Sequence, residues 1–398
     1  MAAIDDLELY ENLHTPCFIF DVNEFERSVS EFRNALNGCF ETTEIGYSVK
    51  TNSLSNVLTK AHALGCMAEV VSFDEFCLAK KCGFGISRII YNGPLKSRET
   101  FIEALVGGAI VNIETKRELE WLYDLPDDKI YKVGIRLNIN VSKVSPEDAD
   151  GENDNSRFGF SDETDEFSDA IKIISSKSNV LLSGLHIHRT VHSRNPDFYY
   201  NSIAYAMNIV EKYSLKLDYI DVGGGYFGRF PNKPTFYDYV SKFKEALGGS
   251  CLKDIKIIVE PGNALIASSF AFLSEVIDVK NVDKETVFVT TDGSRNDIDP
   301  FFKKSDYLKT LFRMSKTEKT VPLQIVSGCT CLEYDRLFCL RDAEALNVGD
   351  RVLYNNVGAY TLTLSPQFIR LWPKVYERND GKYMQIKEAS NVNVLIER

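Results

Sequence analysis

The feature that most limits the fold of this chain is a regular alternation of short apolar runs and longer amphipathic segments. The stretches between the runs, such as SNVLTKAHALG, repeat apolar residues at helical spacing and end on glycine. Eight such β/α units predict an α/β fold, a closed (β/α)8 barrel of the TIM type, in preference to an open sheet. The expected strands are residues 43–49, 67–71, 88–91, 109–113, 131–137, 181–186, 219–222 and 255–259.

The pattern changes after Ser268. Segments such as TVFVTTD and VPLQIVSG alternate apolar and polar residues and are broken by Gly and Asp. This alternation predicts antiparallel β structure, so we expect a second domain to begin near residue 268. Within the barrel region, the acidic, turn-rich stretch VSPEDADGENDNS at 144–156 is expected to be a mobile, solvated loop after the fifth strand.

Composition excludes several classes of function. The chain has 46 basic and 57 acidic residues and no long basic run, so nucleic acid is not an expected partner. It has no run of eighteen apolar residues and no signal-like N-terminus, so we expect a cytoplasmic protein without a membrane partner. Nine cysteines without small-domain spacing argue against disulfides. No ligand pair accompanies Cys329 and Cys331, so no metal site is predicted.

Polar residues follow the apolar strands. The carboxyl ends of barrel strands meet at one face, so residues at these positions share a site even when they lie far apart in sequence. The sequence therefore predicts a polar site at the barrel mouth. Its members are Lys50, Glu69, Ser72, Asn92, Gly93, Arg136, Asn138, His186, His188, Gly223, Gly224, Gly225, Glu260, Pro261 and Gly262.

Lys50 follows the apolar run IGYSV without a polar break. A lysine after a strand is usually a solvated surface residue, but an unpaired ammonium here would be costly. Covalent use removes this cost, because a desolvated lysine has a lowered pKa and condenses with an aldehyde.

Three glycines after the seventh strand, with Gly262 near them, could form only a tight turn. Beside the eighth strand, however, barrels commonly bind phosphate through backbone N–H groups. Glu260 ends the run IKIIVE at the rim, where a carboxylate could keep a pyridine nitrogen protonated. His188 could be a satisfied core histidine or could stack on a flat ring. Together these residues describe pyridoxal 5′-phosphate (PLP) held as a Schiff base on Lys50.

Motifs along nearly the whole chain carry a resemblance. They are YSVKTN with Lys50, EVVS at 69–72, YNGPLKS at 91–97, RFGF at 157–160, GLHIH at 184–188, DVGGGY at 221–226, EPGN at 260–263, SGCTCLEYD at 327–335 and NVGAYTLTLS at 356–365. The chain resembles the fold-type III PLP-dependent decarboxylases, which include diaminopimelate and ornithine decarboxylases. The resemblance implies a barrel over residues 25–267 and a β domain made of residues 1–24 and 268–398. It also implies a head-to-tail homodimer with shared active sites.

The resemblance also implies a role for each matching residue. Lys50 would carry the Schiff base, His188 would stack on the ring, and Glu260 would pair with its nitrogen. The three glycines and Tyr360 would hold the phosphate. Cys331 of a partner subunit would return a proton after CO2 leaves, although a cysteine is more often a small buried hydrophobe. With the other residues at the barrel mouth, the expected cofactor-binding set is Lys50, Glu69, Arg136, His188, Gly223, Gly224, Gly225, Glu260, Gly262 and Tyr360.

The chain departs from the family where a substrate would bind. Asn263 replaces an Arg of the diaminopimelate decarboxylases, Leu332 replaces a Glu, and Asp299 lies where an Arg-Pro is expected. These changes argue against diaminopimelate as the substrate. After His188 the family's Gly-Ser is replaced by Arg189-Thr190-Val191-His192. One phosphate contact is thereby weakened, unless Thr190, Ser193 or Arg189 replaces it.

The sequence thus predicts decarboxylation of an amino acid. Asp299 or Glu333, beside Leu332, would recognise a distal cationic group, which suggests a diamino acid or a related basic substrate. A substrate of secondary metabolism is equally compatible. An amino-acid racemase of the same fold is an alternative, but racemases place Arg against the ring nitrogen where this chain has Glu260. A non-catalytic binding protein is another alternative, which retention of both Lys50 and Cys331 disfavours.

Overall fold

A computed structural model describes residues 10, 12–152, 154–248, 255–314 and 319–396 of the chain. The chain divides into two compact units. We call Arg27–Leu265 the barrel unit, and Met1–Glu26 with Ile266–Arg398 the sheet unit. None of the described helices is both long and apolar enough to cross a membrane.

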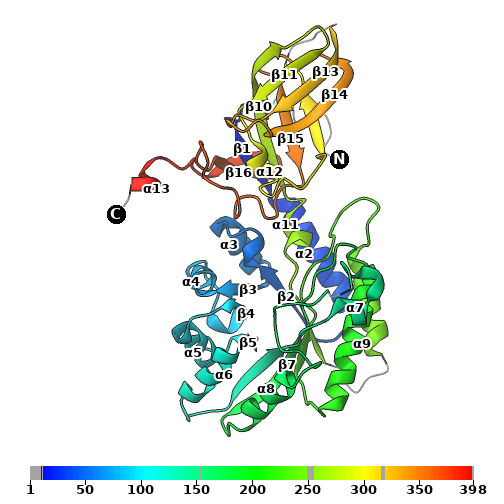
Figure 1. The fold of residues 1–398 in the computed structure, drawn as a ribbon. Helices are drawn as coiled ribbons and strands as arrows, with labels where there is room; N and C mark the ends of the chain where they lie inside the picture. Colours follow the sequence, from blue (N-terminus) through cyan, green and yellow to red (C-terminus); the bar gives the residue numbers. More distant parts are fainter. Residues whose placement is uncertain (1–9, 11, 153, 249–254, 315–318, 397–398) are drawn as a thin grey trace. The chain divides into compact units, whose positions relative to one another are not determined.

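The barrel unit is built on eight parallel strands that close on themselves, β2 pairing with both β3 and β9 (Figure 1). The predicted barrel is confirmed, and each expected run lies on one of its strands. The largest difference is β4, which continues through Asn92 and Gly93 to Leu95. The strands are β2 (Thr43–Ser48), β3 (Met67–Ser72), β4 (Ile89–Leu95), β5 (Ile110–Ile113), β6 (Tyr131–Arg136), β7 (Val180–His186), β8 (Tyr219–Asp221) and β9 (Lys256–Val259).

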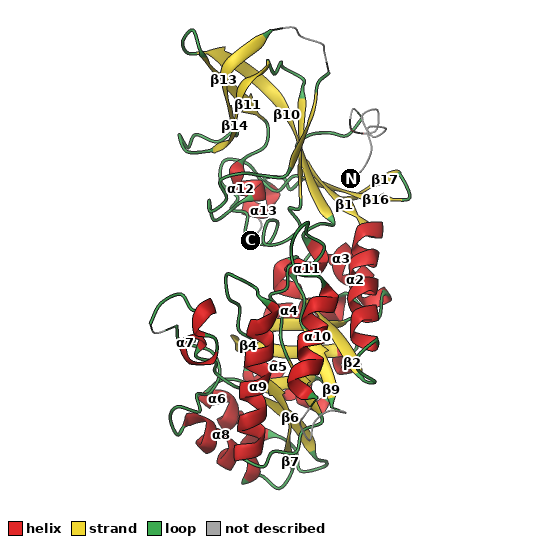
Figure 2. Cartoon of the chain, turned by 90° about the vertical axis from the view of Figure 1, so that its right-hand side faces the viewer, coloured by secondary structure: helices red, strands yellow, loops and turns green. Residues whose placement is uncertain are grey.

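Helices surround these strands (Figure 2). α10 shows why they form: Thr235 and Asp238 make a reciprocal cap at its N-terminus, and Phe236, Tyr239 and Phe243 recur at helical spacing on its buried face. The helices are α2 (Val22–Asn37), which begins in the sheet unit, α3 (Ser55–Ala63), α4 (Phe73–Lys81), α5 (Arg98–Val106), α6 (Lys116–Trp121), α7 (Val141–Val144), α8 (Glu166–Ser175), α9 (Pro196–Lys212) and α10 (Phe236–Leu247), and α11 (Asn263–Ile266) follows β9.

A chain of side-chain hydrogen bonds runs through the barrel interior. The Tyr219 hydroxyl donates to Asn112 over 2.8 Å, and the Asn112 amide donates to Asn92 over 2.8 Å. Gly184 makes room for this chain, because a Cβ there would lie 1.9 Å from the Tyr219 ring. The Asn92 amide then donates to Glu260. The interior thereby fixes a carboxylate at the mouth.

The sheet unit holds a nine-stranded sheet, ordered β14-β13-β11-β10-β1-β16-β17, with β15 on β10 and β12 on β15. The predicted antiparallel β domain is confirmed, and two of its strand pairs, β1 with β16 and β11 with β13, are parallel. The elements are β1 (Cys17–Asp21), β10 (Phe270–Asn281), β11 (Thr286–Thr291), α12 (Arg295–Ile298), β12 (Lys309–Phe312), β13 (Thr320–Ser327), β14 (Arg336–Glu344), β15 (Arg351–Asn355), β16 (Lys374–Asn379), β17 (Lys382–Lys387) and α13 (Asn393–Ile396).

The acidic stretch 144–156 is exposed over much of its described length, as its composition predicts, but it is also attached to the rest of the barrel unit. Asp148 is buried and accepts hydrogen bonds from Ser145, over 2.8 Å, and from Ser193. Asp154 forms an ion pair with Arg189. These contacts join the stretch to the segment after β7. Because both partners lie more than thirty residues away in sequence, composition alone could not reveal the attachment.

Candidate active site

Lys50 lies on a 3-10 turn, Val49–Thr51, directly after β2. Its ammonium donates to Glu69 over 2.6 Å, and Glu69 is buried within the neighbouring strand β3. The Ser48 hydroxyl donates to the same Glu69 oxygen over 2.6 Å. The Lys50 ammonium is therefore not left unpaired, because this carboxylate balances its charge. The Lys50 side chain is still 33% exposed, so the amine remains accessible.

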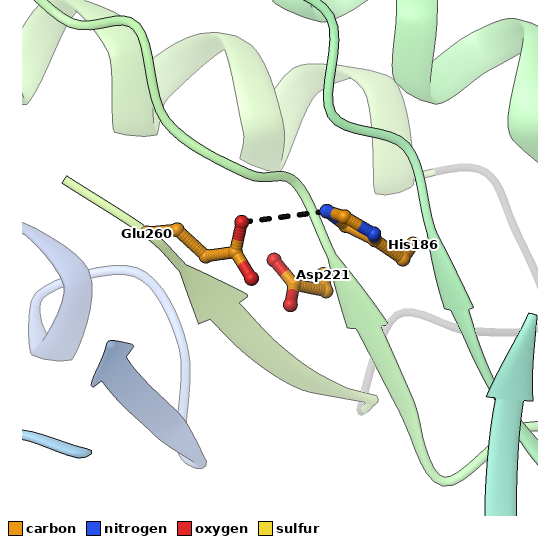
Figure 3. Close-up of side chains that lie close together, drawn as sticks. All are labelled: His186, Asp221 and Glu260. Atoms are coloured by element: carbon orange, nitrogen blue, oxygen red, sulfur yellow. Dashed lines mark ion pairs between the residues drawn. The ribbon is translucent and has the colours of Figure 1, made fainter. Parts of the chain in front are cut away.

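His186, Asp221 and Glu260 meet at the ends of β7, β8 and β9 (Figure 3). Each side chain offers one nitrogen or oxygen atom that could bind a metal ion, and these three atoms lie within 4.8 Å of one another. All three residues are buried. His186 Nε2 lies 3.3 Å from Glu260 Oε2, without the alignment of a hydrogen bond. One imidazole and two carboxylates also suit a divalent cation. Sequence reasoning expected no metal and missed Asp221, although Asp221 directly precedes the VGGGY turn.

The two carboxyl groups have opposite electrostatics. Burial raises the pKa of Asp221 well above its ordinary value, and the charge of Glu260 adds to the effect. Burial is the largest single influence on Glu260 and acts to raise its pKa, but His186, Asp221 and His188 together outweigh it, and the pKa of Glu260 lies below its usual range. The pair therefore carries one negative charge, at Glu260, beside a protonated Asp221.

His188 is held against the glycine turn. The backbone N–H of Gly224 donates to His188 Nδ1 over 2.9 Å. Gly223 has a φ of +70°, and a Cβ there would lie 2.3 Å from the same nitrogen, so only glycine fits. Burial first, and then the charge of Arg136, hold the pKa of His188 well below its ordinary value. His188 is thus a neutral imidazole whose proton is on Nε2. Its Nδ1 accepts a hydrogen bond within the protein, as the alternative of a satisfied core histidine predicts for this atom.

Arg136 contacts the backbone of His188. Its guanidinium donates to Glu114 over 2.8 Å and to the backbone carbonyl of His188 over 3.0 Å. The residue is only 7% exposed. Arg136, predicted as a cofactor contact, therefore has its donors directed at protein groups and orients the neighbouring histidine.

The glycine turn offers unused donors. Within the described part of the chain, the backbone N–H groups of Gly225 and Tyr226 have no acceptor, although Tyr226 is fully buried. A Cβ at Gly262 would lie 2.0 Å from Thr51 Oγ1, so only glycine at this position lets the backbone after β9 approach Thr51 so closely. A phosphate fits such a turn, since it accepts from backbone N–H groups that no side chain covers.

The remaining candidates lie on the sheet unit. Cys331 and Glu333 are exposed, Leu332 is partly exposed, and Tyr360 has a φ of +57° and is 39% exposed. Asp335, buried four residues after Cys331, accepts hydrogen bonds from Ser294 Oγ, from the backbone of Arg295, and from both the backbone and the hydroxyl of Thr330. This carboxylate fixes the loop that carries Cys331.

Asp299 does not match its expected role. It is buried, and its oxygens accept from the Arg295 guanidinium, from the backbone N–H groups of Lys303 and Lys304, and from the Tyr307 hydroxyl. A carboxylate with these partners is already neutralised and hydrogen-bonded within its own unit. Its local contacts give it a structural role, whereas Glu333 keeps an exposed carboxylate.

Several known proteins are similar to this chain over most of its length. A probable chloroplastic diaminopimelate decarboxylase from Oryza sativa is 28% identical over 391 residues, covering 95% of this chain and 78% of that protein. An L-glutamyl-[BtrI acyl-carrier protein] decarboxylase from Niallia circulans is 24% identical and covers 98% of the chain and 94% of its own length. The crystal structure of a diaminopimelate decarboxylase from M. jannaschii shares the fold, with a TM-score of 0.86, 21% identity, and coverage of 99% and 94% of the two chains.

Residues 22–267 match the family model of the pyridoxal-dependent decarboxylase, pyridoxal binding domain. This match spans more than half of the chain, and it includes every barrel residue discussed above. The chain therefore belongs to the pyridoxal-dependent decarboxylases, and its cofactor is pyridoxal 5′-phosphate.

Proposed function

We propose that this enzyme removes the α-carboxylate of an amino acid, with the cofactor attached to Lys50 and with Cys331 as the proton donor. The observation that carries the proposal is the arrangement at the barrel mouth. There, an accessible amine is held on Glu69, and Asn92 donates to both Glu69 and the ionised Glu260. One amide nitrogen contacts both carboxylates, which therefore belong to one site.

When bound, pyridoxal phosphate supplies an electron sink for the bond that loses CO2. Glu260, which stays ionised, would keep the ring nitrogen protonated. His188 would offer the flat face of a neutral imidazole, because Gly224 occupies its Nδ1. Glu69 accepts the Lys50 ammonium and can take part in moving its proton, since the two groups are 2.6 Å apart. The glycine turn and Gly262 would hold the phosphate, and Tyr360 is a further candidate contact.

Cys331 would deliver a proton to the substrate Cα. Its thiol is exposed on a loop that Asp335 fixes through four hydrogen bonds, so it can meet a group outside its own unit. We propose that it acts in the active site of a second copy, in a head-to-tail homodimer. A racemase would need a second base and a ring nitrogen without a proton, whereas Glu260 favours the protonated ring.

The proposed substrate is an amino acid with a distal amino group. Several relatives are diaminopimelate decarboxylases, but Asn263 and Leu332 remove two charged positions of that group. Glu333 is the exposed carboxylate that could receive a distal ammonium, because Asp299 is buried among its own partners. We therefore expect a basic amino acid other than diaminopimelate.

The test is CO2 release from a panel of L- and D-diamino acids, with diaminopimelate included, together with the visible absorbance of the purified protein. The wild type and the exposed-lysine control Lys81→Ala should release CO2 and show the cofactor's bound absorbance band. Lys50→Ala should lose both. The same band in Lys50→Ala, or no CO2 from any substrate, would contradict the proposal.

The proton-donor role needs its own pair of variants. Cys331→Ala should slow product formation and alter the stereochemistry of protonation at Cα, measured by NMR of product made in D2O. Cys339→Ala, another exposed cysteine of the sheet unit, should change neither. If Cys331→Ala behaves like Cys339→Ala, another group supplies the proton.

A further inference from the structure

The segment between β7 and α9 replaces the Gly-Ser that the family carries after the stacking histidine. Three of its side chains could contact an anion: Arg189, Thr190 and Ser193. The structure separates them by what each already binds.

Two of the three are committed to the acidic stretch 144–156. Arg189 is paired with Asp154, and the side chains of this pair are 22% and 12% exposed. Ser193 donates its hydroxyl to the buried Asp148, which Ser145 also contacts. Breaking the first contact would leave Asp154 without its ion-pair partner, and breaking the second would leave the buried Asp148 with Ser145 alone, and both losses are costly. Both side chains are therefore held by the acidic stretch, although the buried Nε of Arg189 has no partner among the described residues.

Thr190, unlike Arg189 and Ser193, makes no side-chain hydrogen bond to the described residues of the acidic stretch. Its side chain is exposed, and within the described residues its hydroxyl has no hydrogen-bond partner. Thr190 Oγ1 lies 3.3 Å from the position that a Cβ would take on Gly225, which has a φ of +101°. It therefore borders the turn where the N–H groups of Gly225 and Tyr226 have no acceptor among described residues.

We propose that the Thr190 hydroxyl donates a hydrogen bond to the phosphate of the cofactor. In this proposal Asp148 and Asp154 hold the segment between β7 and α9 in the position that allows Thr190 to reach the phosphate. Thr190 thereby restores the contact that the altered segment would otherwise lose. A β-branched side chain suits this task, because its hydroxyl has few rotamers to lose on binding. The proposal rests on the proposed placing of the phosphate at the glycine turn.

The experiment compares two ligands that differ only in the phosphate. The full chain is freed of cofactor and titrated with pyridoxal 5′-phosphate and with pyridoxal, and binding is followed by absorbance. Thr190→Val should weaken binding of the phosphorylated ligand about 10- to 100-fold, as expected for one hydrogen bond to a charged group. It should leave pyridoxal binding unchanged. Thr190→Ser, which keeps the hydroxyl, should stay within about 3-fold of wild type.

Two further variants make the outcome decisive. Thr42→Val is the matched control, because Thr42 is exposed before β2, at the opposite end of that strand from Lys50, and should bind both ligands normally. An equal loss for both ligands in Thr190→Val, or no loss for either, would overturn the role of Thr190. Gly225→Ala tests the position of the phosphate separately from the role of Thr190. If it weakens only the phosphorylated ligand while Thr190→Val does not, Thr190 alone is wrong. If neither variant has an effect, the phosphate binds elsewhere.

Discussion

The barrel mouth and the loops of the sheet unit both bury carboxylates, but they satisfy them differently. At the mouth, Asp221 and Glu260 share one charge, and neither ring nitrogen of His186 nor Asp221 Oδ2 has a hydrogen-bond partner among the described residues. In the sheet unit, Asp335 accepts four hydrogen bonds, and Asp299 accepts from two side chains and two backbone groups.

This difference separates chemistry from scaffold. A buried polar atom without a partner costs about 1–3 kcal/mol, so it persists where a ligand or a reaction uses it. A saturated carboxylate instead stabilises the loop around it. The mouth therefore holds the groups that act on the cofactor, and the sheet-unit loops hold Cys331 in a fixed position.

The largest effect that tests this comparison is on activity. Glu260→Gln removes the charge at the mouth but keeps an oxygen for Asn92, so kcat should fall about 10²–10³-fold, the order found when one preorganised electrostatic contact is lost. The folded mouth also stabilises this charge, since the pKa of Glu260 lies below its usual range, so the free energy of unfolding should fall as well, by roughly 2 kcal/mol. Steady-state kinetics and urea unfolding would measure the two effects, with exposed Glu120→Gln as control. An unchanged kcat would mean that Glu260 is scaffold.

The next effect is on stability. Asp335→Ala leaves the Ser294 and Thr330 hydroxyls and two backbone N–H groups without their acceptor, which should cost roughly 3 kcal/mol of folding free energy. Cofactor binding by the barrel should remain. Thermal unfolding and cofactor absorbance measure the two properties, and Glu285→Ala, an exposed carboxylate of the same unit, is the control. An unchanged melting temperature would show that the four bonds do not support the loop.

The sequence predicts the barrel well because its signals are local. Each strand is a short apolar run, each helix repeats at its own period, and the carboxyl ends of parallel strands must converge. Lys50, Glu260 and the glycine turn follow from this geometry. The confirmed family and cofactor rest on the same residues.

The sequence fails where a residue's role depends on a partner far along the chain. Asp299 is an exception, because its guanidinium partner Arg295 and its backbone donors Lys303 and Lys304 lie only four or five residues away, so the local fold of its own loop satisfies it. The composition of the stretch 144–156 gives no sign that Arg189 and Ser193 attach it to the segment after β7. Glu69 on β3 pairs with Lys50, which follows β2, and the periodicity of apolar residues does not predict such a pair. These contacts are decided by tertiary packing, which a single sequence does not display.

The smallest expected effect concerns the proton that Asp221 keeps. Its pKa is raised in the folded state, so unfolding releases this proton at any pH between the ordinary value and the raised one, and stability falls as the pH rises through that interval. Asp221→Asn keeps an acceptor for the N–H of Gly223 and replaces the acid proton by an amide N–H, while removing the titration. Wild type and variant should therefore be nearly equal in stability at pH 4. At pH 5 the variant should be more stable by about 1 kcal/mol, because one pH unit within that interval is worth roughly this much. Urea unfolding at both pH values measures the difference, with Asp218→Asn, which is exposed, as control. A variant that loses stability relative to wild type as the pH rises would show that Asp221 is ionised in the folded protein, and the mouth would then carry two charges in place of one.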